Sequence, residues 1–344
     1  MIKTGIVGAT GYAGSELVRL LYNHPEVDIR IITSDSRKGE YFSDVHPHFQ
    51  GLADIELQPA FKVLEEDLDV VFLALPHGVS MEYVEKYEGA GFRMIDLSGD
   101  FRLSGPDVYT SWYSKKHSYP QGFDGAAYGL PELHREEICA SRLVANPGCY
   151  PTSAILGLAP LVKANIIIPG QVVIDSKSGV TGAGVKAKPT THYSSVSDNF
   201  KAYGLKGHRH TIEIEEQLSG LSSGGPMKVQ FTPHLLPVDR GILSTIYTQP
   251  REGVTEPQLL SLYAEFYDGH PFVRLRKAPP ALKDVRGSNF CDLFVTYDER
   301  TNRIITISVI DNLVKGAAGQ ALQNMNLMFG LEEEAGLVAV PLNP

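Results

Sequence analysis

The chain has 344 residues, of which 43% are hydrophobic and 21% charged, and its formal net charge is −9. This length favours two domains, or one large α/β domain, over a single small core. The acidic balance argues against nucleic acid or an anionic membrane as the main partner, and no apolar run has membrane-spanning length.

The first half of the chain alternates apolar strands with helical stretches. The predicted strands are KTGIVGA, VDIRIIT, LDVVFLALP, FRMIDLS and RLVANP, and SELVRLLYNH has helical spacing. Near-continuous apolar strands separated by helices are typical of a parallel sheet covered on both faces. We therefore predict a Rossmann-type α/β domain over residues 1–148. Because the chain enters a strand at once, without a leader pattern, we expect a cytoplasmic protein or one trimmed from a longer precursor.

The second half has a different pattern. GQVVIDSKSG, PMKVQFTPHLLP, GILSTIYTQ, NFCDLFVTYD and RIITISVI are strand-like, and EPQLLSLYAEFYD is helical. Turns such as YDERTNR join several of these strands, which indicates a mainly antiparallel sheet. We predict a second, α+β domain over residues 149–311, followed by a terminal helix within LVKGAAGQALQNMNLMFG.

A glycine-rich loop joins the first strand to the first helix. Its glycines are Gly8, Gly11 and Gly14, in the spacing G-x-x-G-x-x-G. Glycines let the backbone approach a pyrophosphate, and the following helix N-terminus supplies amides and a positive dipole. We interpret the loop, with Thr10 inside it, as a dinucleotide-binding turn, although such glycines are in other proteins only structural.

The end of the second strand indicates which dinucleotide binds. An acidic residue at this place is typical of NAD sites, but here Ser34 occupies it, with Arg37 and Lys38 close behind. A hydroxyl and two cations suit a 2′-phosphate, so NADP is preferred. Asp35 is a sign against this interpretation, and a solvated turn is the alternative.

Cys139, Cys149 and Cys291 are too few for a disulfide framework and lack metal-ligand spacing, so we expect no metal. Cys149 follows a strand and an Asn-Pro-Gly turn and precedes a helical run. A helix N-terminus stabilises a thiolate, which is the nucleophilic form of cysteine. We predict that Cys149 is a nucleophile, and we interpret Cys139 and Cys291 as buried structural cysteines.

A nucleophile needs a base, and GHRHTIEIEEQL contains the best candidates. His208 and His210 flank Arg209, and Glu213 would orient His210 if a helix begins here. A polar helix start explains these residues equally well. Two further segments suggest an anion pocket: SGDFR with Arg102, and the hydroxyl- and glycine-rich loop SKSGVTGAG, which contains Ser178. Both are also compatible with plain turns.

Together these segments resemble the N-acetyl-γ-glutamyl-phosphate reductases, NADP-dependent enzymes of arginine biosynthesis related to the aspartate-semialdehyde dehydrogenases. The resemblance covers essentially the whole chain. Its most specific motifs are NPGCYPTSAILGLAPL and GHRHTIEIEEQ, supported by GATGYAGSELVRLL, LALPHG, DLSGDFRL, YGLPEL, SGVTGAG and DNLVKGAAGQALQNMNLMFG.

The resemblance implies a role for each matching residue. Cys149 matches the nucleophile, His210 the acid/base and Glu213 its orienter, while His208, Arg102 and Ser178 match substrate or phosphate contacts. Gly8, Thr10, Gly11 and Gly14 match the pyrophosphate loop, and Ser34 and Arg37 the 2′-phosphate site. Asn312 and Lys315 match a segment that returns to the nucleotide, so residues 312–344 would complete the first domain.

The implied reaction is reduction of an acyl phosphate by NADPH through a Cys149 thioester, with release of inorganic phosphate. The implied assembly is a homo-oligomer, a dimer or a tetramer. Two alternatives stay open at this point. One is a related acyl-phosphate reductase, either aspartate-semialdehyde dehydrogenase or the lysine-pathway aminoadipyl-phosphate enzyme. The other is a non-catalytic NADP-binding regulator.

Overall fold

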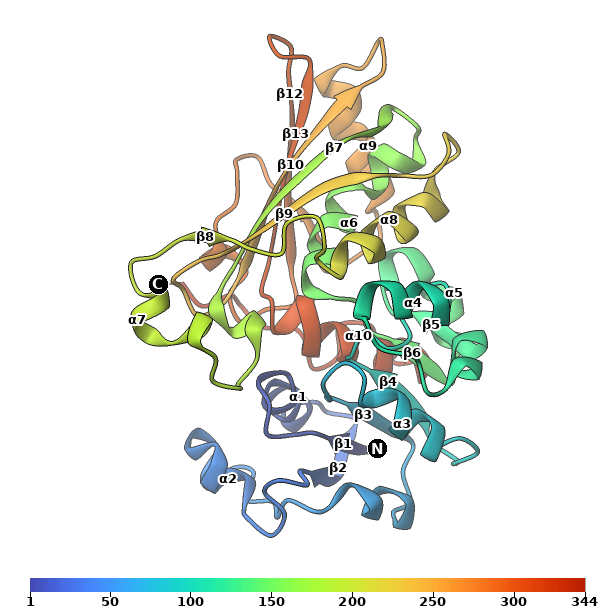
Figure 1. Cartoon of the computed structure of the whole chain (residues 1–344), viewed down its shortest axis with the longest axis vertical. Helices are drawn as coiled ribbons and strands as arrows, with labels where there is room; N and C mark the ends of the chain where they lie inside the picture. The colour runs from blue at the N-terminus through green and yellow to red at the C-terminus, as the bar shows by residue number, and fades with distance from the viewer. Residues whose placement is uncertain (344) are drawn as a thin grey trace. The chain divides into compact units, whose positions relative to one another are not determined.

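The computed structural model describes residues 1–343 and forms two compact units (Figure 1). Unit 1 comprises residues 1–148 and 317–338, and unit 2 comprises residues 149–316 and the end of the chain from residue 339. The chain returns to unit 1 at Ala317, five residues later than the predicted Asn312. The side chain of Asn312 is bonded within unit 2, where its Oδ1 accepts the Gly241 N–H at 2.7 Å. The last residues also belong to unit 2, where Leu342 N donates to the Arg286 carbonyl.

Unit 1 is built on a six-stranded sheet in the order β2-β1-β3-β4-β6-β5, and all of its pairs are parallel. This confirms the predicted parallel-sheet α/β domain. The strands are β1 (Ile2–Val7), β2 (Val27–Thr33), β3 (Val70–Leu73), β4 (Arg93–Asp96), β5 (Ala126–Tyr128) and β6 (Leu143–Ala145). The sequence predicted all of them except β5, because two of its three residues are alanine, which is depleted in strands, whereas β6 lies in an apolar run.

Unit 1 also contains helices. They are α1 (Tyr12–Tyr22), α2 (Phe42–Val45), α3 (Ser80–Lys86), α4 (Pro106–Tyr113), α5 (Pro131–Ala140) and α10 (Gly319–Met328), with the 3₁₀ turns η1 (Pro47–Phe49), η2 (Ala60–Glu65) and η3 (Pro120–Gly125). Helix α1 buries Leu17, Leu20 and Leu21, which are the residues that predicted it. Because β1 pairs with β2 on one side and β3 on the other, its carboxyl end lies at a switch point, where open α/β sheets bind nucleotides.

Unit 2 contains a seven-stranded sheet in the order β11-β12-β13-β10-β7-β9-β8. Its strands are β7 (Ile167–Ser178), β8 (Lys201–Ala202), β9 (Val229–Leu235), β10 (Ile242–Pro250), β11 (Val273–Leu275), β12 (Cys291–Asp298) and β13 (Arg303–Ile310). Four pairs are antiparallel, and the β7–β9 and β11–β12 pairs are parallel. The predicted mainly antiparallel sheet is therefore confirmed. The short strands β8 and β11 were not predicted.

The helices of unit 2 leave one face of this sheet uncovered. Helices α6 (Cys149–Lys163), α8 (His210–Leu221) and α9 (Glu256–Phe266) lie on the same side of the sheet in Figure 1. The excursion between β7 and α8 carries η4 (Val180–Ala183), η5 (Pro189–Thr191) and α7 (Tyr193–Val196). The 3₁₀ turn η6 (Leu282–Asp284) and the π-helical turn η7 (Val314–Ala318) complete the elements. No described helix is long and apolar enough to cross a bilayer.

Candidate active site

Helix α6 begins at Cys149, so the thiol belongs to the first turn of a 15-residue helix. The first turn contains no acidic residue, and the one basic residue at the ends, Lys163, lies in the last turn. The positive end of the helix dipole therefore acts on the thiol without a competing carboxylate in that turn. Cys149 is half-buried, whereas Tyr150 and the residues that follow it through Val162 are buried. This arrangement suits a cysteine that reacts as a thiolate.

A buried hydroxyl network fixes the first turn of α6. Ser153, one turn after Cys149, donates its Oγ hydrogen toward Ser244 of β10 at 2.9 Å and lies 3.1 Å from Ser308 Oγ of β13. Ser244 Oγ in turn lies 2.7 Å from Ser176 Oγ of β7. All four serines are fully buried. Because buried hydroxyls must be hydrogen-bonded, this network ties the nucleophile helix to three neighbouring strands.

Gly316 packs directly against the nucleophile. A Cβ atom at this position would lie 2.8 Å from Cys149 Cβ and 3.3 Å from Cys149 Cα. These distances are below normal van der Waals contact, so a larger residue would displace the cysteine. Gly316 lies in the π-helical turn η7, a type of turn that is frequent at functional sites.

The two predicted histidines lie in one aromatic cluster with Tyr150. His210 is the first residue of α8, and its backbone N–H donates to His208 Nδ1 at 3.2 Å. The ring centroid of Tyr150 is 5.7 Å from that of His208 and 5.9 Å from that of His210. Tyr150 follows Cys149 in the chain, so unit 2 brings the nucleophile and both histidines together. Glu213 lies in the first turn of α8 and is fully buried.

The surroundings of His208 keep its imidazole neutral. Burial, followed by the positive charge of Arg209, lowers the pKa of His208 to about 4. Its Nδ1 accepts the His210 N–H, which requires this nitrogen to be unprotonated. His208 therefore carries no charge at neutral pH.

Two tyrosines that the sequence analysis did not single out complete the surroundings of the thiol. Tyr150 Oη and Tyr203 Oη are 3.0 Å apart, and Tyr150 Oη donates to the His234 carbonyl at 3.1 Å. The Ser178 hydroxyl also contacts Tyr150. Burial raises the pKa of Tyr203 to about 12, and the negative charge of the Cys149 thiolate contributes to the rise. Both phenols are therefore protonated hydroxyl groups near the nucleophile.

In the glycine loop of unit 1 the fold leaves no room for a Cβ at Gly8 and Gly14, but it leaves room for one at Gly11. Gly8 has φ +88°, and a Cβ there would lie 2.5 Å from the Ala74 carbonyl oxygen. A Cβ at Gly14 would lie 2.4 Å from Gly8 O. At Gly11 the nearest atom to such a Cβ is 3.9 Å away, so packing within the protein leaves room there. Gly11 is the N-cap of α1 and makes no side-chain cap, so the first-turn amides suit an anion.

Hydroxyl groups gather where β2 ends. Thr10 Oγ1 lies 3.2 Å from Ser34 Oγ, which is 3.4 Å from Ser36 Oγ. The carboxylate of Asp35 is occupied elsewhere, because Oδ1 accepts the Ala60 N–H and Oδ2 accepts the Tyr83 hydroxyl, both at 3.0 Å. Both carboxylate oxygens of Asp35 therefore have partners within unit 1. The hydroxyl groups and the uncapped helix fit a phosphorylated dinucleotide.

Arg102 is buried and engaged with the backbone of unit 1. Its Nε donates to the Asn146 carbonyl and one Nη to the Leu97 carbonyl, both at 2.7 Å. Asn146 precedes Cys149 by three residues, so Arg102 holds the turn that leads into the nucleophile helix. Nearby, Asp96 accepts hydrogen bonds from Ser80 and Ser98, and its pKa is raised to about 6 by burial and then by the charge of Asp100.

The other predicted residues of unit 2 have interior side chains. Ser178 is buried and donates to the Gly179 carbonyl at 3.0 Å. Asn312 Nδ2 donates to Thr181 Oγ1 at 3.0 Å. Lys315 is fully buried, with Nζ 5.8 Å from the centre of the Phe272 ring. The structure thus gives these side chains partners within unit 2.

Two further features lie away from the predicted site residues. Cys291 is buried as predicted, but the prediction for Cys139 is wrong because that thiol is exposed. Its neighbour Ile138 takes the buried side of α5, which turns Cys139 outward.

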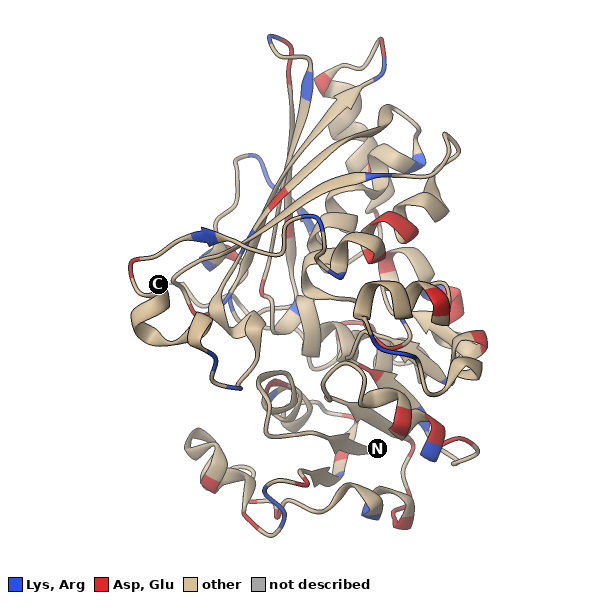
Figure 2. Ribbon diagram, viewed as in Figure 1, with Lys and Arg blue, Asp and Glu red and all other residues tan. Residues whose placement is uncertain are grey.

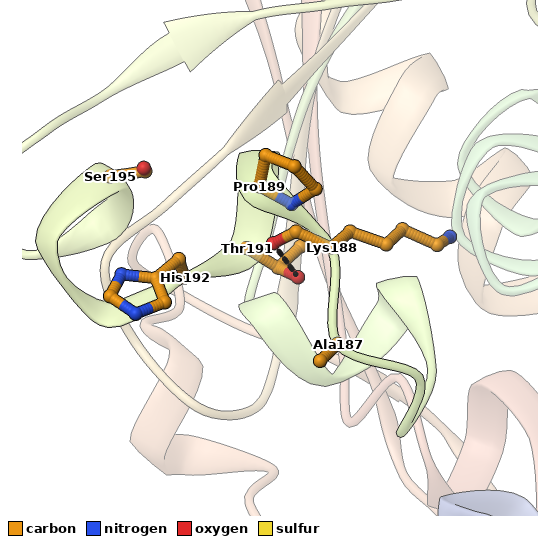
Figure 3. Close-up of a pocket in the computed structure, with 6 residues that line it drawn as sticks. All are labelled: Ala187, Lys188, Pro189, Thr191, His192 and Ser195. Carbon is orange, nitrogen blue, oxygen red and sulfur yellow. Dashed lines mark hydrogen bonds between the residues drawn. The ribbon is translucent and has the colours of Figure 1, made fainter.

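Figure 3 shows a hollow in the excursion between β7 and α8, lined by Ala187, Lys188, Pro189, Thr191, His192 and Ser195. None of the predicted site residues lines it. No described cluster of three or more His, Cys, Asp or Glu residues could hold a metal ion.

Comparisons with known protein families agree with the division of the chain. Residues 3–141 match the family model described as the NAD binding domain of semialdehyde dehydrogenase. Residues 149–312 match the dimerisation domain of semialdehyde dehydrogenase. Both matches concern the same protein family and together span most of the sequence.

Similar whole proteins have been described. The N-acetyl-gamma-glutamyl-phosphate reductase of Citrifermentans bemidjiense is 51% identical over 348 residues and covers 100% of both chains. The protein of that name from Desulforamulus reducens is 50% identical and covers 98% of both chains.

Solved structures show the same fold at lower identity. Aspartate semialdehyde dehydrogenase II from Vibrio cholerae has a TM-score of 0.73 and 17% identity, covering 96% of this chain and 98% of its own. The aspartate semialdehyde dehydrogenase of Candida albicans, solved with NADP, has a TM-score of 0.70 and 17% identity, covering 98% of this chain and 99% of its own.

Proposed function

The chain belongs to the N-acetyl-γ-glutamyl-phosphate reductases, oxidoreductases of arginine biosynthesis in the semialdehyde dehydrogenase family, and we propose that it works through a Cys149 thioester with NADPH. Its substrate is N-acetyl-γ-glutamyl phosphate and its products are N-acetylglutamate 5-semialdehyde and inorganic phosphate. The observation that carries the proposal is the position of Cys149, which begins α6 beside the Tyr150, His208 and His210 cluster.

The first step is attack by the thiolate. Cys149 Sγ forms a bond to the γ-carbonyl carbon, the bond from this carbon to the phosphate oxygen breaks, and inorganic phosphate leaves with that electron pair. The helix dipole of α6 favours the thiolate before the attack. The Ser153 network keeps the first turn of α6 in place, so the sulfur needs little reorganisation to react.

Proton transfer is assigned to His210, with Glu213 as its orienting residue. His208 has a pKa of about 4, so it is a poor proton donor at neutral pH. We assign His208 to substrate contact, together with its hydrogen bond to the backbone of His210. When the tetrahedral adduct on Cys149 collapses to the aldehyde, His210 accepts the proton of its hydroxyl group, the carbon–sulfur bond breaks and the sulfur leaves as a thiolate.

Phosphate binding is assigned to Arg102 and to the loop that follows Ser178. The guanidinium of Arg102 supplies positive charge, and its bonds to Leu97 and Asn146 fix its position. The loop over η4 begins directly after Ser178, and the amides of Gly179, Val180 and Thr181 donate to carbonyls within unit 2, which holds the loop in place. Asn312 supports this loop through Thr181.

The NADPH site would be formed by Gly8, Thr10, Gly11 and Gly14 at the pyrophosphate and by Ser34 and Arg37 at the 2′-phosphate. The room at Gly11 supports a pyrophosphate at the loop, and the hydroxyl groups beside Thr10 and the engaged carboxylate of Asp35 support NADPH over NADH. Asn312 and Lys315 would contribute through the chain segment that they anchor. When bound, the cofactor supplies the hydride that reduces the thioester.

The test is the reverse reaction, followed as reduction of NADP⁺ with N-acetylglutamate semialdehyde, with and without inorganic phosphate. We expect a rate that requires phosphate and is much lower with aspartate semialdehyde. Cys149→Ser should retain NADPH binding and lose nearly all turnover, and Cys139→Ser, which alters the exposed thiol, should behave as wild type. Wild-type turnover in Cys149→Ser would refute the nucleophile. Activity without phosphate would indicate thioester hydrolysis instead.

The oligomer is proposed to form through the uncovered face of the unit 2 sheet. The matched family model is a dimerisation domain. Val173 of β7 and Tyr247 of β10 are 42% and 40% exposed in a sheet whose other face is covered by helices. Figure 2 shows charged residues at only a few places along these strands, and on the face of Val173 the side chains of Asp175 and Lys177 form an ion pair at 3.1 Å, so the proposed contact is apolar with a polar part. A monomer in light scattering at micromolar concentration would contradict this proposal.

The reaction is placed in the cytoplasm. All three cysteines are free, as is typical of a reducing compartment. A reactive thiolate would be oxidised or capped in an oxidising one. Labelling the native protein with a thiol reagent directly after gentle lysis should modify Cys149, and its recovery as a disulfide would contradict this placement.

A further inference from the structure

Two histidines of unit 1 lie outside the site described so far. His46 follows α2 and His48 lies in η1, in the connection that follows β2. The ring centroids of His46 and His48 are 5.9 Å apart, and the ring of Phe42 lies 4.9 Å from that of His46. Phe42 is fully buried, so His46 rests on a fixed aromatic surface.

The position of His46 connects it to the glycine loop. The carbonyl of Thr10 faces its imidazole, and the positive field of Arg37 reaches it. His46 Nε2 is buried and has no hydrogen-bond partner within the described residues 1–343. A buried ring nitrogen without a partner is costly, and each such group requires an explanation. A ligand at the adjacent hydroxyl groups of Thr10 and Ser34 would provide one.

We propose that His46, with His48 beside it, binds the 2′-phosphate end of NADPH together with Ser34, Ser36 and Arg37, and that His46 takes up a proton when the cofactor binds. The inference rests on the proposed NADPH site. It adds a second set of donors, His46 and His48, which lie later in the chain than the turn after β2. A protonated imidazole makes charge-assisted hydrogen bonds to phosphate, which are stronger than neutral ones.

The charges around His46 explain why the proton arrives with the ligand. Burial lowers the pKa of His46, and the positive charges of His48 and Arg37 lower it further, while the Thr10 carbonyl opposes the shift. Without a ligand His46 is therefore neutral at physiological pH. A dianionic phosphate monoester would reverse the local field and raise the pKa of the ring.

The other groups nearby do not take over this role. The remaining ionisable side chains between Ser34 and His48 are Asp35, Lys38, Glu40, Tyr41 and Asp44, all exposed. Asp35 accepts the Ala60 N–H and the Tyr83 hydroxyl, and Glu40 pairs with Arg37 Nη1 at 3.0 Å. The loop from Gly8 to Gly14 has no side chain that is charged at neutral pH. Between pH 6.5 and 9 a phosphate monoester is mostly dianionic, so the phosphate itself contributes little to a change of affinity over this range.

The experiment compares NADPH and NADH affinities by fluorescence titration at half-unit steps from pH 6.5 to 9. In the wild type, NADPH affinity should fall as the pH rises, by up to about tenfold per unit for one linked proton, while NADH affinity stays nearly level. His46→Phe keeps an aromatic ring against Phe42 but cannot be protonated. It should weaken NADPH about tenfold at pH 6.5, the loss expected for one charge-assisted contact, and flatten its pH profile.

Controls separate this inference from the underlying site. His134→Gln removes a histidine of α5 that pairs with Glu137 and should leave both profiles unchanged. His46→Gln, a second neutral variant, should reproduce His46→Phe if either one melts early. NADPH profiles that match wild type in both His46 variants would refute the role of His46 and leave the NADPH site standing. Equal NADPH and NADH affinities in the wild type would refute the NADPH site and this inference with it.

Discussion

Gly11 and Gly14 belong to the same loop, but substitution by alanine should affect a different property at each position. We expect Gly14→Ala to lower stability and Gly11→Ala to weaken NADPH binding. At Gly14 the added Cβ would lie 2.4 Å from Gly8 O and 2.8 Å from the Ala9 carbonyl carbon. These are backbone atoms, which cannot rotate away as a side chain would. Overpacking of this kind costs about 1–3 kcal/mol, and the rigid neighbours place Gly14→Ala at about 3 kcal/mol of lost stability.

Gly11→Ala should preserve the fold and damage the site. Gly11 has φ −78° and ψ 167°, which alanine adopts readily, and the nearest atom to its Cβ is 3.9 Å away. Alanine is a poorer N-cap than glycine, but it reduces the entropy of the unfolded chain by a comparable 0.4–1 kcal/mol or so. The net change in stability should stay within about 1 kcal/mol. The new methyl group would occupy the space that a pyrophosphate needs.

The assay pairs thermal melting with NADPH titration for the two variants. We expect Gly11→Ala to melt near the wild type and to bind NADPH at least about tenfold more weakly, equivalent to about 1.4 kcal/mol. Gly14→Ala should melt several degrees lower. If Gly11→Ala binds NADPH as tightly as the wild type, the loop does not hold the pyrophosphate, and the argument from free space at Gly11 fails.

Three other changes test separate parts of the site. Arg37→Ala removes an exposed ion pair that contributes little to stability, so the melting temperature should not change. We expect NADPH binding to weaken about tenfold and NADH binding to stay the same. Equal weakening of both would refute the role of Arg37 at the 2′-phosphate. The added Cβ of Gly316→Ala should displace Cys149 and lower kcat at least about tenfold, with NADPH binding retained. If thiol labelling and turnover both keep their wild-type rates, the contact between residue 316 and Cys149 does not matter for the reaction. Because the folded pKa of His208 is about 4 and the unfolded one about 6.5, the unfolded state alone takes up a proton as the pH falls between them. Stability to urea should then decline by up to about 3 kcal/mol from pH 6.5 to 4, and His208→Phe should remove most of that decline.

The sequence predicted the fold class because long apolar segments carry their periodicity locally. The five strands it identified in unit 1 have buried residues in continuous runs, and α1 shows Leu17, Leu20 and Leu21 at helical spacing. Strand β5 was missed because alanine, which forms two of its three residues, is depleted in strands, and its pairing with β6 is a tertiary contact. The exposure of Cys139 escaped for a similar reason, since only the docking of Ile138 decides which side of α5 faces outward.

Within the candidate site, the residues found were those with a chemical signature beside a turn or helix start. Cys149 and His210 begin helices, and a helix start is visible in the sequence. Tyr203 and Gly316 gave no such signal, because their importance comes from contacts across more than 50 residues of chain. Tyr203 reaches Tyr150 through a hydroxyl contact, and Gly316 matters by what it lacks, a Cβ beside the cysteine.

Asp35 shows most clearly where sequence reasoning ends and structure is needed. It directly follows Ser34, which holds the place of the acid that binds a ribose in NAD sites, so in the sequence it was the one sign against the prediction of NADP. The structure engages both carboxylate oxygens, with the Ala60 N–H and the Tyr83 hydroxyl, at 3.0 Å each. Moving that carboxylate toward a ribose would break both bonds, at a net cost of about 1 kcal/mol or more for each. The Ser34 hydroxyl contacts only other hydroxyl groups, at 3.2 and 3.4 Å, so it turns toward a ligand at a smaller cost, and this difference supports the proposed 2′-phosphate site.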